Sequence, residues 1–178
     1  MLLWMTRRTV TPALTTERLR LDPLAVADAP EMTAVLADQR LYTFVGGEPP
    51  SVAAVERQYR SWLAGPRLDD EAWLNWIVRL RASGEAIGHA QATWMKRSGA
   101  ADIAWVIGTR WQRRGYATEA AQAVIDWLES QGVATITAHV HPDHIASARA
   151  AERAGLHRTD VAEGGEIVWR RVLATREN

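Results

Sequence analysis

The chain of 178 residues has no cysteine, a single phenylalanine and no excess of charge of either sign. Without cysteine it forms no disulfide, has no cysteine nucleophile and offers no thiolate to a metal, which fits a reducing compartment such as the cytosol. Lysine and arginine total 21, and aspartate and glutamate total 21, so no overall field attracts nucleic acid or an anionic membrane. Any site for an anion must therefore be local.

Long apolar runs are also missing from the sequence. None approaches the roughly 20 residues of a membrane helix, and the apolar run at the N-terminus is too short for a signal peptide. We expect a cytoplasmic protein that binds neither a membrane nor nucleic acid. The length predicts one domain over residues 1–178. Nine tryptophans are expected to fill a core, a pocket or a subunit contact, and a homodimer is compatible with them.

The hydrophobic pattern predicts a mixed α/β fold of the α+β kind. Apolar alternation predicts strands and helical spacing predicts helices, in the order β-α-α-β-β-β-α-β-α-β-β. Most successive strands form hairpins, and one crossover joins two parallel strands at the centre. The sheet should therefore be mostly antiparallel, with six to seven strands and about four helices. The segments expected as strands are TERLRLDPL, 72–80, EAIGHAQATWM, 101–108, 135–141, LHRTDV and EIVWRRV. Asp28 and Ser51 are expected to cap the first and second helices, and Gly132 to end the third.

A change of period marks the stretch WQRRGYATEAA at 111–121. Strand-like alternation precedes it, and apolar residues at helical spacing follow it. A helix start presents unpaired N–H groups and the positive end of the helix dipole, and Gly115 lets a phosphate approach the backbone closely. Arg113 and Arg114 add permanent positive charge. The stretch is therefore a phosphate site or else a charged loop with a glycine turn, and it matches neither a dinucleotide fingerprint nor a P-loop.

The residues around this stretch resemble the GNAT acetyltransferase superfamily. QRRGYA matches the superfamily's Q/R-x-x-G-x-G/A signature, and it stands between a strand and an amphipathic helix, as the family requires. DIAWVIGTRWQRRGYATEA is similar to the RimJ/RimL-like branch, whose typical text is E-I-G-Y-x-I-x-P-x-x-W-G-x-G-Y-A-T-E-A. TERLRLDPL resembles the first strand of that branch, and HPDHIASARAAERAGL follows its P-x-N-x-x-S-x-x-x-x-E-K-x-G-F pattern. The resemblance covers nearly the whole chain, in the right order.

This resemblance implies an acetyl-CoA-dependent N-acetyltransferase whose central parallel strands splay apart. The pantetheine arm of acetyl-CoA would lie in that gap and pair with backbone groups of Val106, Ile107 and Gly108. For Thr118 we favour a contact with the cofactor. For Glu119 we favour the ordinary role of a polar residue that only solvates the start of a helix. With Arg113 nearby, the pyrophosphate would meet the amides of Arg114, Gly115, Tyr116, Ala117 and Thr118.

The downstream motif carries two further site residues and one departure from the family. His144 stands where the family usually has asparagine; its imidazole can still donate one hydrogen bond to the cofactor, or it is plainly exposed. Ser147 matches the family serine near the cofactor sulfur, and it would protonate the leaving thiolate. Its alternative is a helix-surface serine without chemistry. The implied reaction is direct attack of an amine on the thioester, with no covalent enzyme intermediate.

The proton acceptor is less clearly marked. An alkyl ammonium with a pKa of about 10 is protonated at neutral pH, so the site must remove a proton before the amine attacks. Asp102 occupies the position of the branch's usual glutamate, while His139 and His141 share a face of the adjoining strand, and imidazole has a suitable intrinsic pKa. Each has a plain alternative, as a solvent-facing aspartate or a hydrogen-bonded histidine. A backbone N–H near Val106 would stabilise the oxyanion. No metal is expected, because His139, His141 and His144 lack a strong zinc spacing.

The first two predicted helices and their loop should select the acceptor, because they cover the other side of the sheet. We expect a primary amine, on a protein N-terminus or a small molecule. The alternative from another class is a non-catalytic acyl-CoA-binding sensor or scaffold with the same fold. Aromatic and acidic residues of this region favour a cationic amine; they are Tyr42, Phe44, Trp62, Trp73, Trp76, Glu48, Asp69, Asp70 and Glu71.

Overall fold

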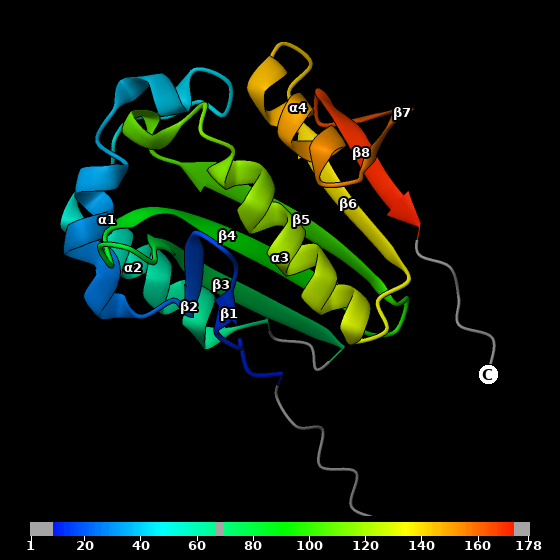
Figure 1. The fold of residues 1–178 in the computed structure, drawn as a ribbon, viewed down its shortest axis with the longest axis horizontal. Coiled ribbons are helices and arrows are strands. Elements are labelled where there is room, and N and C mark those ends of the chain that lie inside the picture. The colour runs from blue at the N-terminus through cyan, green and yellow to red at the C-terminus, as the bar shows by residue number, and fades with distance from the viewer. Residues whose placement is uncertain (1–8, 67–69, 173–178) are drawn as a thin grey trace, which may run out of the picture.

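A computed structural model describes residues 9–66 and 70–172 and places an eight-stranded sheet at the centre of the protein (Figure 1). The strands neighbour one another in the order β1-β2-β3-β4-β5-β6-β8-β7, and every neighbouring pair except β5–β6 is antiparallel. The strands are β1 (Leu14–Thr15), β2 (Leu19–Pro23), β3 (Glu71–Leu80), β4 (Ala86–Met95), β5 (Ala100–Ile107), β6 (Thr135–Val140), β7 (His157–Glu163) and β8 (Glu166–Val172). The predicted mixed sheet is confirmed. It has one strand more than expected, because the two-residue β1 is too short to show a hydrophobic period.

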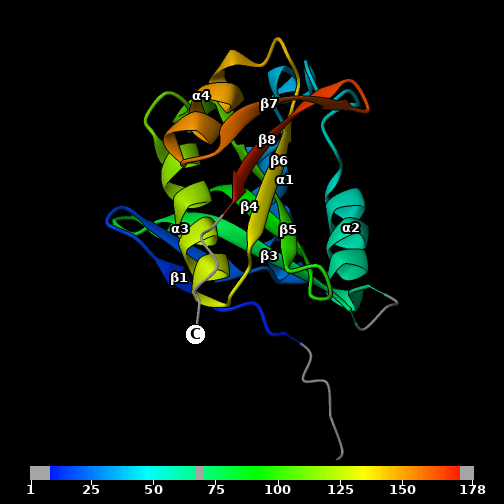
Figure 2. The same cartoon turned by 90° about the vertical axis from the view of Figure 1, so that its right-hand side faces the viewer.

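The helices cover both faces of the sheet. Figure 2 shows α2 on the opposite side of the sheet from α3, and α4 lies on the α3 side. The four α-helices match the number predicted. They are α1 (Ala29–Val35), α2 (Val52–Ala64), α3 (Tyr116–Ser130) and α4 (Ile145–Arg153), and the short 3-10 helices are η1 (Val26–Asp28), η2 (Gln39–Tyr42) and η3 (Thr109–Trp111).

The apolar stripe of α3 holds this helix on the sheet. Beside the stripe, Trp127 meets Trp76 and Trp94 edge-on, with ring centroids 6.1 and 6.4 Å apart. Such edge-to-face pairs add to the stabilisation that burial provides. Gly132 follows the helix with a φ of 84°, the left-handed conformation expected of a glycine stop. The predicted amphipathic face is confirmed, and its buried residues are Ala120, Ala121, Val124, Ile125 and Leu128.

The two parallel strands at the centre pair over only part of their length. Three residues of β5 face β6, and the last of these pairs is Asp102 with Thr137. Beyond it, β5 keeps pairing with β4 as far as Ile107, and β6 keeps pairing with β8 as far as Val140. The strands therefore separate after Asp102 and Thr137, and Figure 1 shows them diverging toward α4. The splayed central pair implied by the family resemblance is present in the fold.

The two predicted helix caps have different outcomes. Ser51 caps α2 as expected, since its Oγ accepts a hydrogen bond from a first-turn N–H at 3.3 Å. Asp28 precedes α1 but caps no N–H of that helix, so this prediction is wrong. Its carboxylate accepts from the N–H of Ala25 at 2.8 Å and pairs with Arg79 of β3 at 2.9 Å. Because Arg79 also pairs with Glu31 at 2.7 Å, these carboxylates attach the α1 segment to the sheet.

Candidate active site

The loop between β5 and α3 has an unusual backbone. Arg113 has a φ of 63°, the only positive φ of a non-glycine residue in the described part of the chain, and Gly115 has a φ of 81°. Left-handed residues occur in the backbone concavities whose N–H groups bind anions. The side-chain amide of Gln112 donates through Nε2 to the carbonyl of Ile107 at 2.9 Å and fixes the start of the loop. Strained backbone of this kind is typical of binding sites.

The start of α3 is open toward solvent. Gly115 is the N-terminal capping residue, and no side chain caps the helix there. The first helical hydrogen bond runs from the N–H of Glu119 to the carbonyl of Gly115 at 3.0 Å. Helix geometry therefore leaves the amides of Tyr116, Ala117 and Thr118 without an acceptor inside the helix. Since Arg113, Arg114 and Gly115 are exposed, a phosphate has access to these amides and to two permanent charges.

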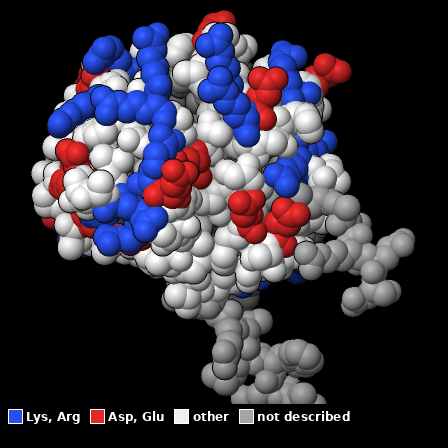
Figure 3. Space-filling view, in the orientation of Figure 1, with Lys and Arg blue, Asp and Glu red and all other residues white. Residues whose placement is uncertain are grey.

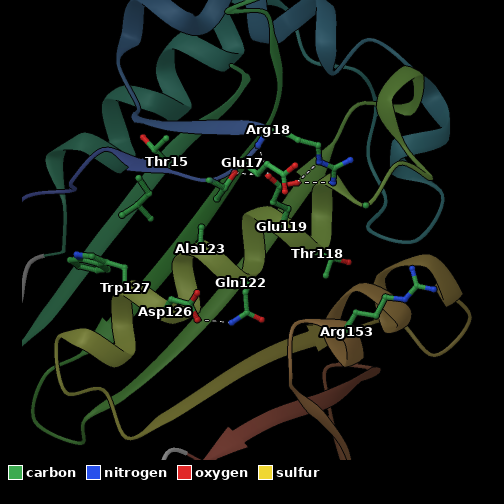
Figure 4. Close-up of a pocket in the computed structure, with 13 residues that line it drawn as sticks. Thr15, Glu17, Arg18, Thr118, Glu119, Gln122, Ala123, Asp126, Trp127 and Arg153 are labelled. Atoms are coloured by element: carbon green, nitrogen blue, oxygen red, sulfur yellow. Dashed lines mark hydrogen bonds and ion pairs between the residues drawn. The ribbon is translucent and has the colours of Figure 1, made fainter. Parts of the chain in front are cut away.

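Arg18, which sequence reasoning missed, lies against this loop from the other side (Figure 4). Its Nε and Nη2 donate to one carboxylate oxygen of Glu119 at 2.7 and 2.6 Å, and its Nη1 donates to the carbonyl of Arg114 at 2.9 Å. Thr16 Oγ1 donates to the other oxygen of Glu119 at 2.6 Å. Arg18, Gly115 and Glu119 line a groove of about 1070 Å³ between the β1–β2 segment and α3. Glu119 thus joins two segments of the fold rather than merely solvating a helix start.

β5, the strand predicted to bind the pantetheine arm, lies in close contact with β4. A Cβ built on Gly88 of β4 would lie 2.0 Å from the carbonyl oxygen of Val106, so only glycine fits there. At the end of β5, the N–H of Gly108 donates to Ile87 at 2.8 Å, and its carbonyl accepts from Trp111 at 2.9 Å. Gly108 is buried, and these bonds already use both of its backbone groups. The contact of the arm with Val106, Ile107 and Gly108 stays a prediction; the N–H of Gly108 is already bonded to Ile87, so we place the arm beside Val106 and Ile107.

His144 and Ser147 stand together at the start of α4. His144 is the N-terminal capping residue, and its Nδ1 accepts from the N–H of Ser147 at a long 3.4 Å. The ring of Phe44 stacks on His144 with centroids 4.4 Å apart, and burial, followed by the neighbouring His141, lowers the pKa of His144. Within the part of the chain that the structure describes, the Ser147 hydroxyl has no hydrogen-bond partner. It is half-buried, which leaves it able to donate a proton to a ligand.

The predicted proton acceptors lie on β6 and the adjoining part of β5. The carboxylate of Asp102 accepts a hydrogen bond from Thr137, at the last paired position before the strands separate. His139 follows on the same face of β6 and is half-buried. His141 Nδ1 accepts from the N–H of Asp143 at 3.2 Å, and its ring lies 5.3 Å from that of Phe44. All three side chains therefore border the region where β5 and β6 diverge.

A fourth histidine, His89, lies near the site and was not predicted from the sequence. His89 of β4 pairs in register with Val106 of β5, and its ring lies 5.8 Å from that of Trp62 on α2. The residue is half-buried, but its Nδ1 is fully buried and has no hydrogen-bond partner among the described residues. Burial lowers the pKa of His89 to about 4, so it is neutral at physiological pH. No sequence motif marks this residue.

The described residues contain no group of three or more histidines, aspartates and glutamates placed to hold a metal ion. None of their helices is long and apolar enough to cross a membrane. Figure 3 shows basic and acidic side chains interspersed on the face that carries α3. Of the acids expected to attract a cationic acceptor, Asp69 lies outside the described residues, Asp70 pairs with Arg97 at 3.6 Å, and Glu71 accepts from Trp73 at 3.3 Å.

Comparison with solved structures finds many proteins of similar fold. An acetyltransferase of Agrobacterium tumefaciens str. C58 is 30% identical, with a TM-score of 0.73, and the match covers 93% of this chain and 96% of that one. A protein of Vibrio cholerae described as a ribosomal-protein-serine acetyltransferase is 20% identical, with a TM-score of 0.74 and coverage of 92% and 100%. AAC(6')-Ib in complex with paromomycin and acetyl-CoA is 21% identical, with a TM-score of 0.71 and coverage of 88% and 94%.

The family comparison agrees with the structural one. The model of the acetyltransferase (GNAT) domain matches residues 18–157, which include the β5–α3 loop and the start of α4. No curated protein matches the chain. The matched residues run from Arg18 to His157 and so cover most of the sheet. The chain therefore belongs to the GNAT acetyltransferase family and is an acetyl-CoA-dependent N-acetyltransferase.

Proposed function

We propose that the protein moves the acetyl group of acetyl-CoA to a primary amine by direct attack within a ternary complex. The observation that carries this proposal is the separation of β5 from β6 beyond Asp102 and Thr137, directly ahead of an exposed helix start. Strand edges freed in this way offer unpaired backbone groups to an extended ligand. The helix start next to them suits the pyrophosphate at the other end of the same ligand.

The donor would lie along these two features. Its phosphates would face the amides of Gly115, Tyr116, Ala117 and Thr118, with the side chains of Arg113 and Arg114 at the entrance. Its pantetheine arm would run beside Val106 and Ile107 and bring the thioester toward Ser147 and His144. The open helix start, the left-handed backbone of Arg113 and the free edge of β5 support this placement.

The thioester supplies an activated carbonyl carbon, and the protein supplies the proton transfers. An amine with a pKa of about 10 must lose a proton before it attacks. We assign that role to Asp102, held by Thr137 at the base of the divergent strands, with His141 as the other candidate and His139 between them on the same face. Ser147 would then donate its hydroxyl proton to the thiolate that leaves and recover a proton from solvent, while the proton taken from the amine passes from the base to solvent.

The acceptor is proposed as a primary amine on a protein N-terminus or on a small molecule. The RimJ/RimL-like residues around Gly115, and the likeness to a protein described as a ribosomal-protein-serine acetyltransferase, support a protein N-terminus. The likeness to AAC(6')-Ib, seen with paromomycin and acetyl-CoA, supports a small molecule. Both similarities concern the fold, so the acceptor has to be found by assay.

The assay measures free thiol released from acetyl-CoA in the presence of N-terminal peptides, polyamines and aminoglycosides. Release above the blank without amine, together with mass-spectrometric detection of an acetylated amine, is the expected result. A matched panel of the same compounds with the amine blocked should release no thiol. Tight binding of CoA with no release for any amine would contradict the proposal and favour an acyl-CoA sensor.

A further inference from the structure

Arg18 contacts the β5–α3 loop where α3 begins, and it does so from the N-terminal part of the fold. It lies just ahead of β2, and three of its nitrogens donate: Nε and Nη2 to Glu119, and Nη1 to the carbonyl of Arg114. The guanidinium also lies over the ring of Tyr116, 4.7 Å from its centroid. A Cβ on Gly115 would come within 3.3 Å of Nη2. One side chain thus contacts Arg114, Tyr116 and Glu119 and lies close to Gly115, from the loop to the first turn of α3.

The carboxylate of Glu119, which pairs with Arg18, would repel a bound anion if it were unpaired. Glu119 lies in the first turn of α3, close to the proposed phosphate site. Burial raises the pKa of Glu119, but hydrogen bonds from Thr16 and from the N–H and side chain of Arg18 outweigh that effect and lower it. The group is therefore a full negative charge, and Arg18 is its counter-ion. Because the charges of Arg18 and Glu119 offset each other, the helix dipole, Arg113 and Arg114 set the electrostatic potential at the phosphate site.

We propose that Arg18 is a positioning residue for the phosphates of the donor. It holds the carbonyl of Arg114 and the ring of Tyr116 so that the amides of the helix start stay open, and it neutralises Glu119. Nε, Nη1 and Nη2 each donate within the protein, so three of the five guanidinium N–H groups are committed to the loop and to Glu119, and Arg18 acts on the site through these contacts. This inference rests on the proposed use of the loop as a pyrophosphate site.

The test compares a donor that has the pyrophosphate with one that lacks it. Arg18→Ala and Arg18→Lys are assayed with acetyl-CoA and with S-acetylpantetheine, and Arg20→Ala serves as the control. Arg20 is an exposed neighbour that pairs with Asp22 at 2.7 Å, and among the described residues it makes no hydrogen bond to the β5–α3 loop. Lysine keeps the charge but loses the fork that reaches two acceptors at once, so it should not restore binding fully.

We expect Arg18→Ala to raise the KM for acetyl-CoA about tenfold to a hundredfold, with kcat and the acceptor KM within about twofold of the parent. Arg18→Lys should show a smaller increase, and Arg20→Ala none. With S-acetylpantetheine, all variants should behave alike. Equal losses with both donors, or no loss with either, would overturn the proposal. If Arg18→Ala does not fold, the same comparison applies to Arg18→Lys.

Calorimetric titration keeps this test independent of turnover. CoA should bind Arg18→Ala about tenfold to a hundredfold more weakly than the parent, and pantetheine should bind both equally. This result supports the role of Arg18 even if no amine is acetylated, an outcome that would refute only the proposed acceptor chemistry. Adding Glu119→Gln to Arg18→Ala should recover part of the CoA affinity, because it removes the unpaired carboxylate. A double variant as weak as Arg18→Ala would overturn the neutralising role.

Discussion

Replacing Gly88 by alanine tests whether the exact position of β5 matters for the donor. The added Cβ would lie 2.0 Å from the Val106 carbonyl oxygen, 2.9 Å from Ile107 Cδ1 and 3.0 Å from Ile107 Cα. The first and last of these are backbone atoms, which cannot rotate away as a side chain would. The strand must therefore move by about 1 Å or more to reach an ordinary van der Waals separation. Val106 and Ile107 are the residues that we assign to the pantetheine arm.

Two terms set the expected loss of stability. Overpacking a well-filled site costs about 1–3 kcal/mol, and replacing a strand glycine by alanine returns about 0.5–1 kcal/mol of backbone entropy. Gly88 does not have a positive φ, so no backbone strain is added. We expect the free energy of unfolding to fall by roughly 1–2 kcal/mol, while a displacement of about 1 Å in the donor strand lowers kcat/KM for acetyl-CoA by about a hundredfold.

Urea unfolding and steady-state kinetics on the same preparations separate these effects. Gly84→Ala is the matched control: it adds the same methyl group in the β3–β4 turn, at a φ of 75° with nothing within 4 Å. It should lose about 1–2 kcal/mol through backbone strain alone and keep normal kinetics. Parent-like kinetics for Gly88→Ala, despite its loss of stability, would refute the reasoning that ties donor binding to the position of Val106 and Ile107.

Three further substitutions address individual side chains. His89→Gln tests burial: because its pKa is lowered to about 4 in the fold, the parent should be fully stabilised above pH ~6.5 and lose stability as pH falls toward 4. Between about pH 7.5 and about pH 5, the free energy of unfolding measured with urea should fall by about 2 kcal/mol more in the parent than in the variant. Equal falls in the two proteins would disprove the pKa shift. Ser147→Ala should lower kcat at least about tenfold without changing CoA affinity, and unchanged turnover would remove Ser147 from the mechanism. Asp102→Asn keeps a hydrogen-bond acceptor for Thr137 but should lower kcat about a hundredfold at neutral pH; full activity there would transfer the proton-accepting role to the histidines.

Features that depend on local periodicity were predictable from the sequence. The stripe from Ala120 to Leu128 indicates both the helix and its buried face, because every third or fourth residue returns to the same side. Gly132 and Ser51 mark helix ends through chemistry that lies within a few residues. The divergence of β5 from β6 was reached through the family resemblance, since strand periodicity carries no information on where pairing stops.

Features that depend on distant contacts were not predictable. Arg18 and Glu119 are 101 positions apart, and nothing in either segment shows that their side chains meet. Asp28 has the residue type and place of a helix cap, yet Arg79 of β3 takes its carboxylate instead. His89 has the alternation of a strand residue, and only the packing of α2 and β5 around it shows that it is neutral. Tertiary contacts decide between roles that local chemistry permits equally.

A crystal structure of the protein with CoA tests the central claim most directly. The account predicts the pyrophosphate at the amides from Gly115 to Thr118, with the pantetheine arm between β5 and β6 beside Val106 and Ile107. Arg18 should keep its bonds to Glu119 and to the Arg114 carbonyl in that complex. CoA bound with its pyrophosphate away from the start of α3, or with its pantetheine arm outside the gap between β5 and β6, would contradict the account.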